Sequence, residues 1–219
     1  MVTVAGVDGC RGGWVAVTDA GAAVLPSFAA VLDALPADAV VAVDVPIGLE
    51  DAYVRGGRAC DRAARALLGP KRGASVFPAP PRRALRARSI EQARSKGWPA
   101  TKQGLGILPK IVDVDRVMAP SLQSRVFEVH PELSFCRMNR GVPVLSNKLQ
   151  RAGRDERRAL LAEAGVPVPA RCGQGEAEDD LLDACALWWS ARRIAVGRSG
   201  RVPEQPPVDS RGLRMEINW

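Results

Sequence analysis

The first third of the chain alternates short apolar segments with glycine-rich turns. Residues 2–8, 14–18 and 22–26 have the composition of strands, and the turns between them predict an antiparallel meander. Residues 27–35 have the apolar spacing of an amphipathic helix, with Ser27 as its N-cap. The chain therefore opens as three strands followed by a helix.

The rest of the chain mixes one more pair of strands with several helices. Residues 39–45 form an unbroken apolar run, which is typical of a parallel strand covered on both faces. A further strand is expected at 125–129, and the helical spacing of the remaining segments predicts helices at 58–68, 154–164 and 178–196. This order predicts a mixed α/β fold with a five-stranded sheet flanked by helices.

Two segments lack a clear period. Residues 70–123 are rich in Pro and Arg, and we expect them to form a basic insertion within a single domain that spans 1–219. Residues 203–219 are expected to form an ordered tail, because Leu213, Met215, Ile217 and Trp219 alternate as in a strand.

The composition favours a cytoplasmic protein with a sizeable core. Apolar residues make up 47% of the 219 positions, and the sequence has neither a run long enough to span a membrane nor a secretion signal. The cysteines are odd in number and include no C-x-x-C pair, so we expect reduced, mostly buried thiols at Cys10, Cys60, Cys136, Cys172 and Cys185.

The charge distribution favours an anionic partner such as DNA or RNA. The net charge is +7, and residues 58–96 hold eleven basic side chains against two acidic ones. The alternative is that GC-rich coding raises the arginine content, since Arg outnumbers Lys by 26 to 5. The candidate phosphate-binding residues are Arg11, Lys71, Arg72, Ser75, Arg82, Arg83, Arg86 and Arg88.

Acidic residues lie where strands end or a helix begins. They are Asp8, Asp44, Glu128 and the i, i+3 pair Asp180 and Asp183. Two carboxylates about 4 Å apart repel by roughly 4 kcal/mol at an effective dielectric of about 20, so a cluster of them requires protons or cations. Oxygen ligands favour Mg2+ or Mn2+.

Each acidic residue also has a structural interpretation. Asp8 and Asp44 can stabilise the turns that follow them, and Asp180 can complement a helix dipole. Asp183 interrupts the apolar run LLDACALWW, so it requires either a metal or an arginine partner such as Arg58 or Arg192.

His130 is the single histidine, which excludes the H-E-x-x-H and zinc-triad patterns. The sequence contains no Gly-x-Ser-x-Gly motif for acyl transfer. His130 is either a proton relay beside the metals or a structural imidazole.

Several motifs together resemble a known family. GVDGCRGGWVAV resembles the first hairpin of RNase H-like nucleases, and LLDACALWW resembles a helix of the RuvC Holliday junction resolvases. The ordered set GVDGCRGGW, DVPIGL, CDRAARALLG, SVFPAP, KIVDVD, FEVHPELSF and DDLLDACALWW resembles domain-of-unknown-function family 429, a group of predicted RNase H-like nucleases.

The resemblance implies an RNase H-like fold and a nuclease that cleaves phosphodiesters with two cations about 3.5–4 Å apart. It implies that Asp8 bridges the cations and that Asp44 and Asp183 each hold one, with Asp180 and Glu128 completing the shells. Glu128 has no counterpart in the resolvases. The alternatives are a phosphotransferase or ATPase of the actin-like core, and a non-catalytic nucleic-acid-binding protein.

Overall fold

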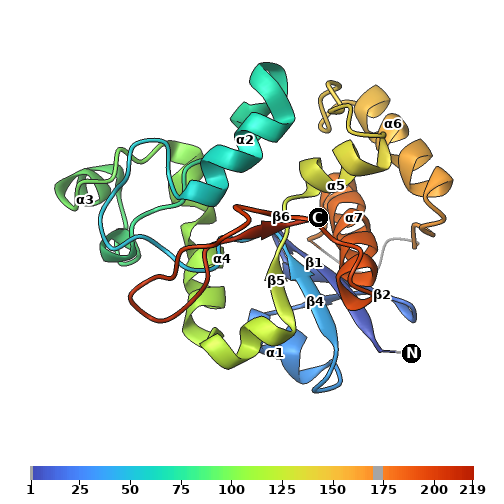
Figure 1. Ribbon diagram of the computed structural model, residues 1–219, viewed down its shortest axis with the longest axis horizontal. Coiled ribbons are helices and arrows are strands. Elements are labelled where there is room, and N and C mark those ends of the chain that lie inside the picture. Colours follow the sequence, from blue (N-terminus) through green and yellow to red (C-terminus); the bar gives the residue numbers. More distant parts are fainter. Residues whose placement is uncertain (1, 170–174) are drawn as a thin grey trace.

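The computed structural model describes residues 2–169 and 175–219. Its centre is a five-stranded sheet in the order β3-β2-β1-β4-β5 (Figure 1). The first three strands are antiparallel, and β4 and β5 run parallel to β1. The strands are β1 Val4–Cys10, β2 Gly13–Thr18, β3 Gly21–Leu25, β4 Val40–Val43 and β5 Val126–Glu128. The expected mixed α/β fold is confirmed.

Helices cover both faces of the sheet. One face packs against α5, α6 and α7, and the other packs against α1 and α4. Figure 1 shows α7 running alongside the central strands. The helices are α1 Phe28–Asp33, α2 Ala59–Arg72, α3 Ile90–Ser95, α4 Lys102–Val117, α5 Pro131–Met138, α6 Arg151–Glu163 and α7 Glu178–Ala195. Short 3-10 turns occupy Gly73–Ser75, Arg82–Ala84 and Pro120–Ser124.

The segment expected to be an aperiodic insertion contains a long helix that builds the core. α4 begins after Thr101, whose hydroxyl accepts from the Gly104 N–H at 3.0 Å. Asp113 in α4 accepts from the Trp14 indole at 2.8 Å, which ties the helix to β2. The sequence pattern failed here because Pro109 and the glycines of α4 have low helix propensity.

Helix α2 continues past the expected stop at residue 68. Gly69 adopts φ 69°, which kinks the helix, and Pro70 then starts a further turn that ends at Arg72.

The C-terminal segment packs beside β5. It forms a two-stranded sheet of β6 Arg201–Val202 and β7 Ile217–Asn218, and Val129 pairs with Asn218. Leu213, Met215 and Trp219 are buried.

Four cysteines are buried free thiols, namely Cys10, Cys60, Cys136 and Cys185. Cys172 lies outside the described residues. Across 2–169 and 175–219, no helix is long and apolar enough to cross a membrane.

Candidate functional site

The alternation of β1 determines where Asp8 points. Val4 and Cys10 face α7, whereas Ala5 and Val7 face α1 and α4. Asp8 has the parity of Val4 and Cys10, so it lies on the α7 face of the sheet. Its Oδ1 accepts from the Gly9 N–H at 2.7 Å, and only 8% of the residue is exposed.

Gly6 allows α7 to lie directly against β1. A Cβ atom at Gly6 would lie 2.0 Å from the backbone nitrogen of Trp188 and 2.1 Å from the carbonyl oxygen of Ala184, so no larger residue fits. Asp8 follows Gly6 by two residues and Asp183 precedes Ala184 by one, so this close packing places Asp183 near the end of β1. The glycine is therefore a requirement of the site as well as of the core.

The three predicted aspartates interact electrostatically. Burial, together with the charges of Asp44 and Asp183, raises the pKa of Asp8 well above its ordinary value. Burial also raises the pKa of Asp44, although the charges of His130 and Lys148 offset part of that increase. Burial raises the pKa of Asp183 to about 6. Asp8 therefore lies within electrostatic range of both Asp44 and Asp183.

A lysine supplies positive charge to this cluster. The Lys148 ammonium lies 2.5 Å from Asp183 Oδ2 and 3.8 Å from an Asp179 carboxylate oxygen. The negative charges of Asp183, Asp8 and Asp44 raise the Lys148 pKa, although burial lowers it. The partner of Asp183 is therefore Lys148, and neither of the arginines considered from the sequence takes that position.

One carboxylate oxygen in the cluster has no partner. Asp183 Oδ1 is buried and makes no hydrogen bond to any of the described residues, and Asp183 is 2% exposed. An uncompensated buried carboxylate oxygen costs free energy unless a cation or a donor reaches it. The all-oxygen donor set fits Mg2+ or Mn2+.

The carboxylates of Asp8, Asp44 and Asp183 do not form a ready-made metal site in this structure. Within the described part of the chain, no three His, Cys, Asp or Glu side chains are grouped to hold a metal ion. A divalent cation would therefore have to bring the aspartates closer together and move the Lys148 ammonium off Asp183.

Asp180 and His130 both cap helices near the cluster. The Asp180 carboxylate accepts from the Ala177 N–H at 3.0 Å, and its charge contributes to the raised pKa of Asp8. His130 Nδ1 accepts from the Glu132 N–H at 3.2 Å at the start of α5. Its Nε2 lies 3.3 Å from the Ser75 carbonyl. Both therefore have structural roles beside the site.

Glu132 belongs to this neighbourhood, although the sequence analysis missed it. Its Oε1 accepts from Arg157 at 2.8 Å and also from Arg72, while its Oε2 is buried and has no hydrogen-bond partner among the residues that the structure describes. The charge of Glu132 contributes to the raised pKa of both Asp44 and Asp183. The FEVHPE motif contains both Glu128 and Glu132, and the position of Glu132 at the start of a helix was the available signal in the sequence.

Glu128 lies on the opposite face of the sheet. It pairs in register with Val43, which faces α1 and α4. Both carboxylate oxygens accept from Arg58, at 2.5 and 2.8 Å, and Oε2 also accepts from the Ile47 N–H at 2.6 Å. Glu128 is thus held in a buried ion pair and is not grouped with the aspartates.

The predicted phosphate-binding residues divide into two groups. Arg72 pairs with Glu132, and Arg82 pairs with Asp115 at 2.9 Å and with Asp209. Ser75 donates to the Arg72 carbonyl at 2.8 Å. Five side chains remain exposed to solvent, namely those of Arg11, Lys71, Arg83, Arg86 and Arg88.

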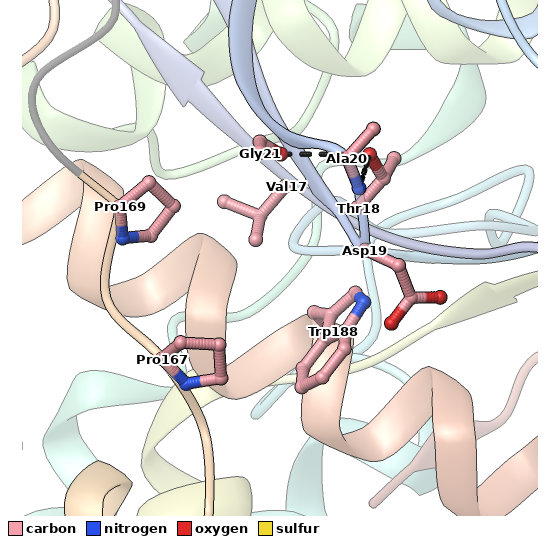
Figure 2. A pocket seen from close by; sticks show the side chains of 8 residues that line it. All are labelled: Val17, Thr18, Asp19, Ala20, Gly21, Pro167, Pro169 and Trp188. Atoms are coloured by element: carbon pink, nitrogen blue, oxygen red, sulfur yellow. Dashed lines mark hydrogen bonds between the residues drawn. The ribbon is translucent and has the colours of Figure 1, made fainter.

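A pocket of about 270 Å³ lies at the β2–β3 turn. Figure 2 shows Pro167 and Pro169 on one side of it, with Trp188 of α7 and the turn residues around the remainder. Because β1 and β2 are antiparallel, this turn lies at the opposite end of the strands from Asp8. Among the described residues that line it, Asp19 is the single ionisable side chain, so they offer no acid–base pair.

Replacing Asp8 with Asn should stabilise the protein in EDTA at neutral pH. The folded-state pKa of Asp8 is raised, so the stability that protonated Asp8 contributes is fully present below the ordinary Asp pKa and is lost as pH rises through the folded value. Asn carries no charge, so the advantage of the variant should grow with pH. Urea unfolding of both proteins at about pH 4 and about pH 8 measures this difference. Equal stabilities at both pH values would contradict the repulsion between carboxylates.

The comparisons with known proteins agree with the motifs. A family model described as protein of unknown function (DUF429) matches residues 6–208. Neither the search of curated proteins nor the search of solved structures returned a match. Since the model covers most of the chain, the protein belongs to the family described as protein of unknown function, DUF429.

Proposed function

We propose that the protein is a metal-dependent phosphodiesterase that acts on nucleic acid. The observation that carries this proposal is the unpartnered, buried Oδ1 of Asp183 beside the carboxylates of Asp8 and Asp44. The sheet order 3-2-1-4-5 is compatible with an RNase H-like nuclease. An actin-like phosphotransferase would duplicate this core, whereas the described residues contain one five-stranded sheet.

In this proposal the three aspartates hold Mg2+ or Mn2+ through carboxylate oxygens. The bound metal lowers the pKa of a water molecule and stabilises charge on the phosphate. Asp8 and Asp44 approach from the ends of adjacent strands, and Asp183 approaches from α7. The Lys148 ammonium neutralises part of the cluster through Asp183. A bound cation would take over that role, and Lys148 would then be available to contact a substrate phosphate.

Exposed basic residues would hold the nucleic-acid backbone. Lys71 follows the kink of α2, and Arg83, Arg86 and Arg88 follow along the chain. These side chains are free to contact phosphates, because none of them forms an ion pair within the described residues. Such contacts position a backbone without reading its sequence.

A cleavage assay tests the proposal. Single-stranded, duplex, hybrid and branched DNA and RNA should be incubated with Mg2+ or Mn2+, and at least one substrate should be cut. Asp183→Asn should reduce the rate by at least about a hundredfold, since even residues that only orient metal ligands contribute tenfold to a hundredfold. The control is Asp155→Asn, an exposed acidic residue of α6. Cleavage by Asp183→Asn at the wild-type rate would rule out this site.

A further inference from the structure

A hollow of about 470 Å³ lies at the C-terminal ends of α5 and α7, beside the last residue of the chain. We name it the arginine hollow after four of its lining residues, Arg137, Arg140, Arg193 and Arg198. Trp189 and Trp219 also line it, and no acidic side chain does.

The four arginines have no acidic partners among residues 2–169 and 175–219. By contrast, the neighbouring Arg201 and Arg214 both pair with Glu216, at 3.4 and 3.3 Å. Arg193 Nε is buried and makes no hydrogen bond within the described part of the chain. Like charges gathered without counter-charges repel one another, so the arginine hollow is suited to an anion.

Aromatic rings hold two of the guanidinium groups in place. The Arg137 guanidinium lies 4.9 Å from the Trp219 ring centroid, and that of Arg193 lies 4.7 Å from the Trp189 centroid. Stacking occupies the face of a guanidinium and leaves its N–H donors free at the edge. Arg193 also donates to the Arg198 carbonyl at 2.6 Å, which orients the planar group.

The helix dipole explains only part of this arrangement. Basic residues at the C-terminal end of α7, such as Arg193, are stabilised by the partial negative charge there. Arg198 lies beyond α7, and Arg140 lies beyond α5. Arg140 adopts φ 56°, a conformation that is uncommon for residues other than glycine. The arginine hollow is therefore lined by side chains from three segments, namely the C-terminal end of α5, the C-terminal end of α7 and the C-terminal residue Trp219.

We propose that the arginine hollow binds a phosphoryl group, either free or esterified in a nucleic-acid strand. Arginine forks match phosphate oxygens in pairs, and the hollow offers four of them. Arg193 lies ten residues after Asp183 on α7, or about 15 Å along the helix. A nucleic-acid duplex advances about 3.4 Å along its axis per nucleotide of one strand, so roughly four base steps span that distance. Binding at the hollow does not depend on the proposed metal chemistry.

Calorimetric titration in EDTA tests this proposal apart from the metal site. Inorganic pyrophosphate and a short single-stranded DNA are the two probes, and at least one should bind to wild type. Arg140→Gln/Arg198→Gln should weaken that binding at least about tenfold, since a charge-assisted hydrogen bond typically contributes that much. Both side chains are exposed, and Gln tolerates the Arg140 backbone no worse than Arg does.

The matched control is Arg116→Gln/Arg151→Gln, which removes two exposed arginines outside the hollow. Wild-type affinity in the control and weakened affinity in the hollow variant support the proposal. Binding of pyrophosphate alone identifies a free phosphate ligand, and binding of DNA alone identifies a strand. No binding of either probe, or equal weakening in both variants, overturns it. Loss of metal binding in Asp183→Asn would leave this result unchanged.

Discussion

Replacing Arg58 with Met is expected to lower the free energy of unfolding by about 3–5 kcal/mol, the usual cost of breaking a buried ion pair. Arg58 is 1% exposed and donates to the carboxylates of Asp61 and Glu128 and to the carbonyls of Ile47 and Gly48. The variant leaves two carboxylates buried without a counter-charge. This loss is a large share of the stability of a typical domain.

Urea unfolding measures the effect, with Arg94→Met as a control at an exposed arginine. Burial raises the pKa of Glu128 to about 7 even with Arg58 present. The loss should therefore shrink as pH falls, because a protonated Glu128 carries no unpaired charge. Adding Glu128→Gln to the variant should recover part of the stability. A loss below about 1 kcal/mol would show that the ion pair contributes no more than an exposed one.

Replacing Lys148 with Met should lower the free energy of unfolding of the metal-free protein and raise its affinity for a divalent cation. The Lys148 side chain is 34% exposed, so the expected loss of stability in EDTA is about 1–3 kcal/mol, below that of a fully buried pair. A cation would no longer compete with the ammonium for Asp183. The affinity for Mn2+ should rise about tenfold, which corresponds to about 1.4 kcal/mol. Calorimetric titration and urea unfolding in EDTA measure the two effects.

Lys148→Arg is the matched control, because it keeps the positive charge beside Asp183. Its affinity for Mn2+ should stay near the wild-type value, although the guanidinium is larger than the ammonium. If Lys148→Met binds Mn2+ no more tightly than wild type does, the lysine does not compete with the cation.

Local sequence pattern was sufficient to predict the sheet and to select three aspartates as candidate site residues. Asp8 lies near the end of β1, Asp44 directly follows β4, and Asp183 interrupts the buried helix α7. Glu128 fits the same description, yet it faces the other side of the sheet. Position at the end of a strand was visible in the sequence. The face of the sheet toward which Glu128 points could not be predicted, because it depends on the register between β4 and β5.

Contacts between distant segments could not be predicted from the pattern. Lys148 lies in an irregular stretch before α6 and meets Asp183, 35 positions further along the chain. The arginine hollow likewise joins the ends of α5 and α7 to the C-terminal residue. The sequence showed Gly6 as a glycine within a strand. Its role, which is to allow the backbone of α7 to pack directly against β1, depends on a contact between segments far apart in the chain.

Calorimetric titration with Mn2+ tests the central claim most directly, namely that Asp8, Asp44 and Asp183 form a divalent-cation site. Wild type and Asp155→Asn should release or absorb heat on binding, and their melting temperature should rise with the ion. Asp183→Asn should bind the ion at least about tenfold more weakly. Absence of heat in wild type, or wild-type affinity in Asp183→Asn, would contradict the account.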